Sequence, residues 1–471
     1  MKRIIIINII FCVIAFSANA TIHLPSIFCN NMVLQQNANV KIWGTANYGE
    51  KLTIVGSWSD KEYTAKADKK GNWSTNIGTP KAGGPYTLTV SGSATITFDN
   101  VMIGEVWLCT GQSNMGFTAK SGLLNGDEEV ANANYPNIRF FKVQRAQADE
   151  PQNDCIGQWV ECSPKTMRRF SSVGYFFGRE LHQKLNVPIG LIESTWGGTS
   201  IELWTPQKVI CKDPVAHKSA QIGTRWPIEN VSTMFNAMIY PLIPFQIAGN
   251  IWYQGESNRY NISGYSHLMG LMINAWRKSW NYNFPFYYVQ IAPFRYNEPY
   301  TGALIREQQL QAMNIPNTGM VVTTDVGNPE DVHPKNKQVV GRRLALWALA
   351  KTYSLDNLTY SGPIYKRLEI KGHKIELSFD HAEDGLQVKG DKLIGFEIAG
   401  ADQQFYRAEA SIKGSKIQVS AREVKNPVAV RFGFSNISEP NLYNKAGLPA
   451  SPFRSDRWYV DISPEAVKGE K

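Results

Sequence analysis

The chain has 471 residues, which is too many for one ordinary hydrophobic core and predicts two or three domains. Hydrophobic residues make up 43% of it and charged residues 19%, as is typical of a globular protein. The net charge of +9 comes from basic residues scattered among acidic ones. A nucleic-acid-binding surface needs a basic stripe, so nucleic acid is not an expected partner.

The first 20 residues have the features of a secretory signal peptide. Lys2 and Arg3 precede an apolar run over residues 4–16, and the segment ends in the pattern Ala18-x-Ala20. The apolar run is too short to span a membrane. We therefore expect cleavage after Ala20 and a secreted or periplasmic protein with no membrane insertion.

Six cysteines are present, and five remain after Cys12 is removed with the signal peptide. Export permits disulfides, and Cys155 with Cys162 could close a small loop. At least one thiol stays free, and Cys109, within a predicted core strand, is the expected buried one. Neither CxxC nor HExxH occurs, and the seven histidines do not cluster. Neither a metal site nor another cofactor is therefore expected.

Residues 21–100 are predicted to form an N-terminal β-sandwich-like region. Short segments in which apolar and polar residues alternate are separated by turns rich in glycine, asparagine and proline. Their spacing is that of a β-sandwich. The predicted strands are residues 40–43, 51–55, 63–65, 86–90 and 94–98.

Residues 101–354 are predicted to form a doubly wound α/β domain. Apolar strands alternate here with segments of helical periodicity, which indicates βαβ units, a parallel sheet, and ligands bound at the C-terminal ends of the strands. The predicted strands are residues 102–108, 188–193, 247–253, 284–291 and 318–324. The predicted helices lie within residues 170–185, 265–276, 304–313 and 337–349.

Residues 355–471 are predicted to form a C-terminal β-rich region. Strand patterns return at residues 368–370, 374–378, 393–398, 416–420 and 428–432. The order along the chain leaves open whether the two β-regions pack together around the inserted α/β domain.

Ser113 follows the first strand of the α/β domain, next to Gly111, which permits a sharp turn. Nucleophilic serines occupy such positions because the hydroxyl must be exposed while the backbone stays rigid. A serine needs a base to take its proton, and His333 is the candidate because imidazole titrates near neutral pH. Asp331 is the candidate to orient that imidazole and to stabilise its protonated form.

Acyl transfer also requires hydrogen-bond donors directed at the developing oxyanion. The backbone N–H of Ser113 is the first predicted donor. The second is Gly198, which has no side chain to block approach. The third is a side-chain amide from the end of the third strand, either Gln254 or Asn258.

Four segments that follow predicted strands carry distinctive sequences: GQSNM at residues 111–115, WGGT at 196–199, WYQGESN at 252–258 and DVHPKNK at 331–337. Together they resemble the sialate O-acetylesterase family of SGNH (GDSL-type) hydrolases, and the resemblance covers nearly all of the mature chain. It implies a flavodoxin-like SGNH domain that removes O-acetyl groups from sugars. It also implies Ser113, His333 and Asp331 as the triad, with Gly198 and Gln254 in the oxyanion hole.

Two positions depart from the pattern of the wider superfamily. Its aspartate usually stands three residues before the histidine, where this chain has Glu330. Asp331 is our choice, while Glu330 or a Ser–His dyad without a carboxylate stays open. The third block of the superfamily usually offers an asparagine, and here Gln254 is preferred over Asn258.

The sequence therefore predicts a serine-dependent carbohydrate O-acetylesterase that acts on 9-O-acetylated sialic acids. One alternative is an esterase for acetylated xylan or xyloglucan oligosaccharides, and another is a glycan-binding protein without catalysis. Arg295 and Arg306 are candidates to pair with a sialic acid carboxylate. The complete set of candidate substrate contacts is Trp196, Glu256, Asn258, Arg295 and Arg306.

Overall fold

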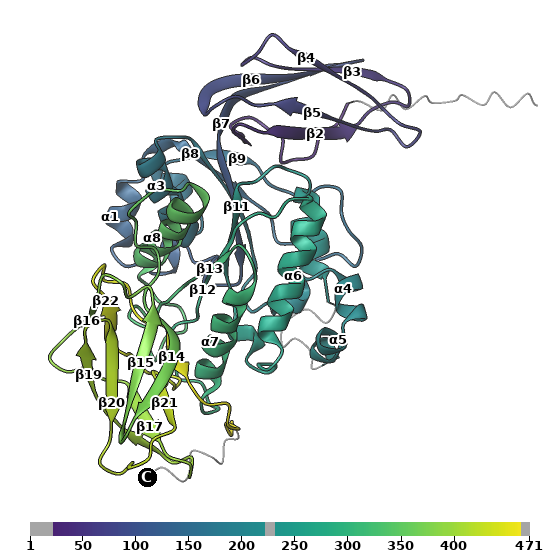
Figure 1. The fold of residues 1–471 in the computed structure, drawn as a ribbon. Helices are drawn as coiled ribbons and strands as arrows, with labels where there is room; N and C mark the ends of the chain where they lie inside the picture. Colours follow the sequence, from purple (N-terminus) through teal and green to yellow (C-terminus); the bar gives the residue numbers. More distant parts are fainter. Residues whose placement is uncertain (1–21, 222–230, 463–471) are drawn as a thin grey trace, which may run out of the picture.

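The computed structural model describes residues 22–221 and 231–462 (Figure 1). The predicted signal peptide lies outside these residues and stays a prediction. An α/β domain occupies the middle of the molecule, and one β-region lies at each end of it (Figure 1). The two β-regions therefore do not pack together as one unit.

A parallel sheet forms the centre of the α/β domain, which confirms the predicted fold class. Its strand order is β13-β12-β11-β7-β10-β8, and antiparallel β9 follows at the edge next to β8. The strands are β7 (Thr95–Gly111), β8 (Tyr135–Lys142), β9 (Trp159–Cys162), β10 (Ile189–Thr195), β11 (Gly249–Tyr253), β12 (Phe286–Val289) and β13 (Thr318–Val321).

Helices cover both faces of this sheet: α3 and α8 pack on one face, and α6 and α7 lie on the other (Figure 1). The four are α3 (Ser172–Leu185), α6 (Tyr265–Trp280), α7 (Thr301–Gln311) and α8 (Lys337–Trp347). The hydroxyl of Ser171 caps α3 by accepting the backbone N–H of Gly174 at 3.0 Å. α3 buries Val173, Phe177 and Leu181, whose four-residue spacing places them on one face.

β7 is long enough to belong to two sheets. Its first half pairs antiparallel with β6 (Gly83–Ser91) in the N-terminal region. Its second half lies between β10 and β11 in the parallel sheet. The strand passes the predicted boundary at residue 100 without a break and is buried from Val101 to Gly111. Its C-terminal end is therefore held by a partner strand on each side.

The remaining strands of the N-terminal region are short. β3 pairs with β4 and β6, β2 pairs with β5, and β1 pairs in parallel with β7. Their bounds are β1 (Val33–Gln35), β2 (Asn39–Thr45), β3 (Lys51–Gly56), β4 (Glu62–Lys66) and β5 (Asn72–Gly78).

The C-terminal region contains two four-stranded antiparallel sheets, β14-β15-β20-β19 and β18-β17-β21-β23, and the pair β16-β22. A hydrophobic core of its own lies within it. The strands are β14 (Ile364–Lys371), β15 (Lys374–Asp380), β16 (Leu386–Val388), β17 (Phe396–Ala399), β18 (Phe405–Arg407), β19 (Glu409–Lys413), β20 (Lys416–Ser420), β21 (Ala429–Phe432), β22 (Leu442–Asn444) and β23 (Phe453–Arg454).

The sequence patterns missed β8 and β9. Pro136 and Arg139 interrupt the apolar pattern of β8, which made this strand hard to recognise. Arg139 is nevertheless buried, because its guanidinium donates to the side chains of Asn31 and Asn100 and forms an ion pair with Glu161 at 3.2 Å. A buried charge is tolerated where it is paired in this way.

Cys155 and Cys162 are both free and lie in different hydrophobic clusters, so the possible disulfide between them is not formed. The Sγ atom of Cys162 approaches the carbonyl oxygen of Ala133 at 3.7 Å. Burial raises the pKa of both thiols to about 12. Cys109 is buried, as expected. Buried thiols with a raised pKa carry little of the reactive thiolate.

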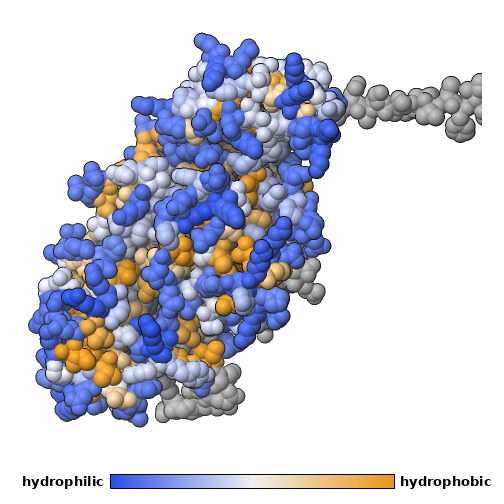
Figure 2. Space-filling view, turned by 45° about the vertical axis from the view of Figure 1, so that its right-hand side comes forward, coloured by the Kyte–Doolittle hydropathy of each residue, from blue (hydrophilic) through white to orange (hydrophobic). Residues whose placement is uncertain are grey.

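Hydrophilic side chains cover most of the face shown in Figure 2, and apolar side chains form small patches between them. Within residues 22–221 and 231–462, no helix has both the length and the apolar character that crossing a membrane requires.

Candidate active site

Gly111, the last residue of β7, sets the direction of the loop that carries Ser113. Its φ of +134° is unfavourable for any residue with a side chain, and a Cβ here would lie 2.3 Å from the carbonyl oxygen of Tyr253. The backbone N–H of Gln112 then donates to that same oxygen at 3.0 Å. Ser113 follows in the turn and is half-buried. The close packing fixes its backbone while the side chain stays accessible.

Ser113 and His333 meet although 220 positions separate them in the chain: His333 Nε2 lies 2.8 Å from Ser113 Oγ. Burial lowers the pKa of His333, the positive charge of Lys337 lowers it further, and Asp331 partly opposes this. The imidazole is therefore largely neutral at pH 7 and can accept the serine proton. This pair can activate a hydroxyl for attack on an ester.

Asp331 lies beside His333 without forming the expected side-chain hydrogen bond. Its Oδ1 is 3.7 Å from His333 Nδ1, within ion-pair range, and accepts the backbone N–H of His333 at 2.9 Å. Glu330 is exposed and instead binds Arg295, with its Oε1 2.7 Å from Nη2 and 3.0 Å from Nε. Of the two carboxylates, Asp331 is thus the one placed next to the imidazole.

We expect Asp331→Asn to lower kcat by roughly 10- to 100-fold, less than the roughly 10⁴-fold loss seen when a directly bonded triad aspartate is changed. The contact is electrostatic at 3.7 Å, and Asn retains the acceptor for the His333 backbone N–H. Glu330→Gln is the matched control and should change kcat less than about twofold, because an exposed ion pair contributes little. The measurement is kcat from initial rates of ester hydrolysis. A greater loss of kcat in Glu330→Gln than in Asp331→Asn would contradict the assignment of Asp331 as the carboxylate that acts on His333.

Two backbone donors are available beside Ser113 for an oxyanion. Among the described residues, the backbone N–H groups of Ser113 and Gly198 donate to no protein acceptor. The loop with Gly198 lies close, since a Cβ on the neighbouring Gly197 would sit 3.2 Å from the Cβ of Ser113. Free N–H groups next to a nucleophile are what a developing negative charge requires.

The side-chain amides proposed as the third donor are occupied elsewhere. Gln254 is fully buried, and its Nε2 donates to Asn258 Oδ1 at 2.7 Å and to the carbonyl oxygen of Thr199 at 3.2 Å. Asn258 is also buried, and its Nδ2 donates to Glu202. The prediction that one of them completes the oxyanion hole is not supported, because both donors are used to hold the loops around the site.

A buried polar cluster beneath the nucleophile contains Gln112, Asn114, Glu256 and Lys337. Glu256 accepts the Nε2 of Gln112 and the Nδ2 of Asn114, both at 2.7 Å, and Lys337 Nζ donates to Asn114 Oδ1 at 2.6 Å. Burial lowers the pKa of Lys337 to about 7 and raises that of Glu256. Asn114 also donates to the carbonyl oxygen of Val332, next to His333, at 2.9 Å. The cluster thus connects the nucleophile turn to the histidine loop.

Sequence reasoning missed the role of this cluster, although both Asn114 and Lys337 lie within the motifs that carried the resemblance. The available signal was a lysine four residues after His333, at the start of a predicted helix. Glu256, expected to contact substrate, is 5% exposed and is a structural partner of the nucleophile loop instead.

Two more of the expected substrate contacts, Arg306 and Asn258, are corrected because their side chains are buried. Arg306 is fully buried and its guanidinium donates to the carbonyl oxygen of Ser435, so it cannot reach a ligand. Asn258 is 2% exposed. Arg295 is exposed and paired with Glu330, and its expected contact with substrate stays a prediction. Trp196, the remaining residue among the expected substrate contacts, is half-buried and directly precedes Gly197, and its contact with substrate also stays a prediction.

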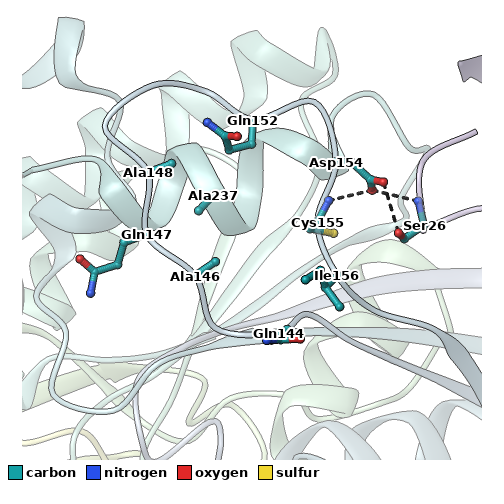
Figure 3. Close-up of a pocket in the computed structure, with 10 residues that line it drawn as sticks. All are labelled: Ser26, Gln144, Ala146, Gln147, Ala148, Gln152, Asp154, Cys155, Ile156 and Ala237. Carbon is teal, nitrogen blue, oxygen red and sulfur yellow. Dashed lines mark hydrogen bonds between the residues drawn. The ribbon is translucent and has the colours of Figure 1, made fainter. Parts of the chain in front are cut away.

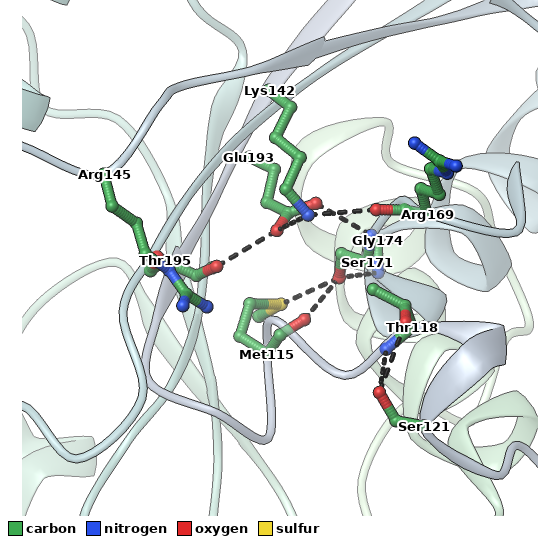
Figure 4. A network of polar contacts seen from close by, with 10 residues as sticks. All are labelled: Met115, Thr118, Ser121, Lys142, Arg145, Arg169, Ser171, Gly174, Glu193 and Thr195. Atoms are coloured by element: carbon green, nitrogen blue, oxygen red, sulfur yellow. Dashed lines mark hydrogen bonds and ion pairs between the residues drawn. The ribbon is translucent and has the colours of Figure 1, made fainter. Parts of the chain in front are cut away.

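A second polar network lies beside the nucleophile loop, at the end of β10 (Figure 4). Buried Glu193 accepts the backbone N–H of Ser171 at 2.8 Å and the hydroxyl of Thr195 at 3.0 Å, and pairs with Lys142 Nζ at 2.8 Å. The hydroxyl of Ser171 donates to the carbonyl oxygen of Met115 at 2.6 Å. This network anchors the nucleophile loop to the start of α3. No group of three His, Cys, Asp or Glu residues suited to a metal ion is present in the described part of the chain.

Comparison with known proteins agrees with this geometry. The family model described as "Carbohydrate esterase, sialic acid-specific acetylesterase" matches residues 103–350. The human sialate O-acetylesterase is 31% identical over 93% of each chain, and the mouse one is 29% identical over 95% of this chain and 97% of its own. The crystal structure of a carbohydrate acetylesterase from Xanthomonas citri is similar with a TM-score of 0.85, at 37% identity over 93% of this chain and 100% of that one.

Proposed function

Because this chain belongs to the family of sialic acid-specific carbohydrate acetylesterases, we propose that it hydrolyses O-acetyl esters of sialic acids, the 9-O-acetyl ester in particular, with Ser113 as the nucleophile. The observation that carries the proposal is the 2.8 Å contact between Ser113 Oγ and His333 Nε2 at the C-terminal edge of the parallel sheet. Ligands bind at that edge in doubly wound folds.

The first half of the reaction forms an acetyl-enzyme. Ser113 Oγ attacks the acetyl carbonyl carbon while His333 Nε2 takes the hydroxyl proton. The carbonyl oxygen becomes an oxyanion, which the backbone N–H groups of Ser113 and Gly198 stabilise. When the intermediate collapses, His333 returns the proton to the departing sugar oxygen, so the sugar leaves with a free hydroxyl.

The second half releases acetate. Neutral His333 removes a proton from a water molecule, which attacks the acetyl carbon and forms a second oxyanion at the same two donors. Collapse breaks the bond to Ser113 Oγ, and the proton held by His333 returns to that oxygen. Asp331, within ion-pair distance of the imidazole, favours its protonated form in both halves.

Acetate release from three substrates tests this proposal. The wild-type protein should hydrolyse 9-O-acetyl-N-acetylneuraminic acid with a higher kcat/KM than acetylated xylo-oligosaccharides. Hydrolysis of p-nitrophenyl acetate is the control that shows an active esterase, whichever sugar it prefers. A higher kcat/KM for the xylo-oligosaccharides would replace the sialate proposal with a hemicellulose esterase.

A covalent probe separates the enzyme from a glycan-binding protein. A fluorophosphonate should add to the peptide that contains Ser113, as read by mass spectrometry, because only an activated serine attacks the phosphorus. Absence of both labelling and acetate release would favour a protein that binds glycans without catalysis.

A further inference from the structure

An anionic substrate calls for a cation near Ser113. Arg306 is buried and cannot supply it, and Arg295 already has a carboxylate partner in Glu330. Lys142, at the end of β8, is also neutralised, because its Nζ lies 2.8 Å from the carboxylate of Glu193.

Arg145 differs from these three cations. It is exposed, and its Nε donates to the carbonyl oxygen of Thr195 at 3.3 Å, while it pairs with no carboxylate within the described residues. This contact uses one edge of the guanidinium. The two terminal nitrogens are left to bind a carboxylate in the bidentate geometry that arginine favours.

The contacts of Arg145 place its guanidinium close to the loop that carries Ser113. Thr195 is directly paired with Gly111 in the sheet, two positions before Ser113. The guanidinium carbon lies 6.0 Å from the ring centre of Trp196, which directly precedes Gly197. The side chain is drawn beside Thr195 in Figure 4, next to the nucleophile loop with Met115.

The loop that carries Arg145 is anchored by a backbone hydrogen bond on each side: the N–H of Gln144 donates to the carbonyl oxygen of Ile156 at 2.8 Å, and that of Ala148 to the carbonyl oxygen of Thr233 at 3.4 Å. Its neighbours Gln144 and Ala146 line a pocket of about 460 Å³ (Figure 3). On the far side of this pocket, Asp154 accepts the backbone N–H of Ser26 at 2.9 Å and its hydroxyl at 3.2 Å. A guanidinium on an anchored loop loses less freedom when it binds a ligand.

We infer that Arg145 is the specificity-determining residue that binds the carboxylate of an acetylated acidic sugar while its ester lies at Ser113. The inference rests on the proposed function and adds to it the residue that distinguishes acidic from neutral sugars. Arg145 takes no part in the chemical step, so its removal should affect substrates that carry a carboxylate and leave the others unchanged.

A matched pair of substrates tests this: 9-O-acetyl-N-acetylneuraminic acid and its methyl ester, which is neutral at the carboxyl but otherwise the same. We expect Arg145→Gln to lower kcat/KM for the acid by about 10- to 100-fold, the value of a charge-assisted hydrogen-bonded pair. Acetate release from the methyl ester and from p-nitrophenyl acetate should change less than about twofold, because neither substrate uses that pair.

Two further variants sharpen the result. Arg145→Lys should recover part of the activity on the acid, because it keeps the charge but not the bidentate fork. Arg169→Gln is the control: Arg169 is also exposed, and its guanidinium points away from the network in Figure 4, so the preference for the acid should stay.

Equal loss on the acid and the methyl ester would show that Arg145 is structural and would overturn the inference. So would an unchanged kcat/KM for the acid, or a wild-type protein that does not prefer the acid to its methyl ester. Each of these outcomes would overturn the role of Arg145 but not the esterase activity, because wild-type protein still releases acetate in all of them. If the proposed function itself fails, wild-type protein releases acetate from neither sialic acid substrate.

Discussion

Ser113→Ala is expected to lower kcat for acetate release by roughly 10⁴- to 10⁶-fold, as removal of a catalytic serine does in other serine hydrolases. Without Oγ no acetyl-enzyme can form, and the neutral His333 has no hydroxyl to activate. Residual hydrolysis would come from the two backbone donors and from His333 acting on water. The protein should remain folded, because the side chain is half-buried and its hydroxyl hydrogen-bonds to His333 at the surface of the site rather than to the core.

The measurement is acetate release under single-turnover conditions, with Ser121→Ala as the control. Ser121 is exposed, and its hydroxyl hydrogen-bonds to Thr118, three residues earlier in the chain, so its removal should change kcat less than about twofold. His333→Ala should lose nearly as much as Ser113→Ala, and the double variant no more than either, because the pair acts as one unit. Losses that multiply in the double variant would show that the two residues act separately.

Lys337→Met tests the buried polar cluster beneath the nucleophile. Met has a similar length, but the change takes the positive charge of Lys337 away from the buried carboxylate of Glu256, so the folded state is also expected to lose stability. It also removes the donor to Asn114 Oδ1 and leaves that atom without a partner. We expect kcat at the pH optimum to fall by roughly 10- to 100-fold, because the turn that carries Ser113 loses a charge-assisted hydrogen bond.

The pH dependence gives Lys337→Met a signature that loss of stability alone would not produce. Activity requires neutral His333, so kcat/KM falls as the pH drops through the pKa of that imidazole. In the wild type this pKa is below its usual value of about 6.5, partly because of the positive charge of Lys337. Removing the charge raises the pKa of His333, and the acidic limb of the profile should therefore move to higher pH.

Lys335→Met is the control for this experiment, because Lys335 is exposed and lies only two residues from Lys337. Its profile should match that of the wild type. An acidic limb that stays in place in Lys337→Met, or moves to lower pH, would contradict a role for Lys337 in setting the proton affinity of His333.

Much of the α/β domain could be predicted from the sequence because its strands are fully buried and stand out as apolar runs. β10 and β11 are examples, each buried along its whole length. Ser113 and His333 could be paired because each follows such a strand, and the ends of parallel strands meet at one edge of the sheet. β8 could not be recognised because Arg139 has the appearance of a surface residue, and the side chains that accept from its guanidinium, Asn31 and Asn100, are distant in the chain.

The three polar residues after β11 were assigned to the substrate or the oxyanion for one reason. Gln254, Glu256 and Asn258 follow a strand at the correct edge, and this position was interpreted as contact with substrate. The order of residues does not indicate which way such side chains point. Glu256 is bound by Gln112 and Asn114, which lie more than 140 positions away, and Gln254 by Asn258 and Thr199. Arg145 was overlooked because it follows β8, a strand that the sequence patterns missed, and because it lies in none of the four motifs.

β7 has a consequence for how this protein can be divided. One uncut strand begins among the N-terminal β-strands and ends at the turn of the nucleophile, so the N-terminal region is not an independent module on a linker. Trimming the protein at residue 101 would cut β7 and remove β1 and β6, the strands that pair with its residues 101–104. The N-terminal region supports the strand that ends at the reactive serine. To exchange this region for that of a relative, the two sequences would have to be joined within the continuous strand β7.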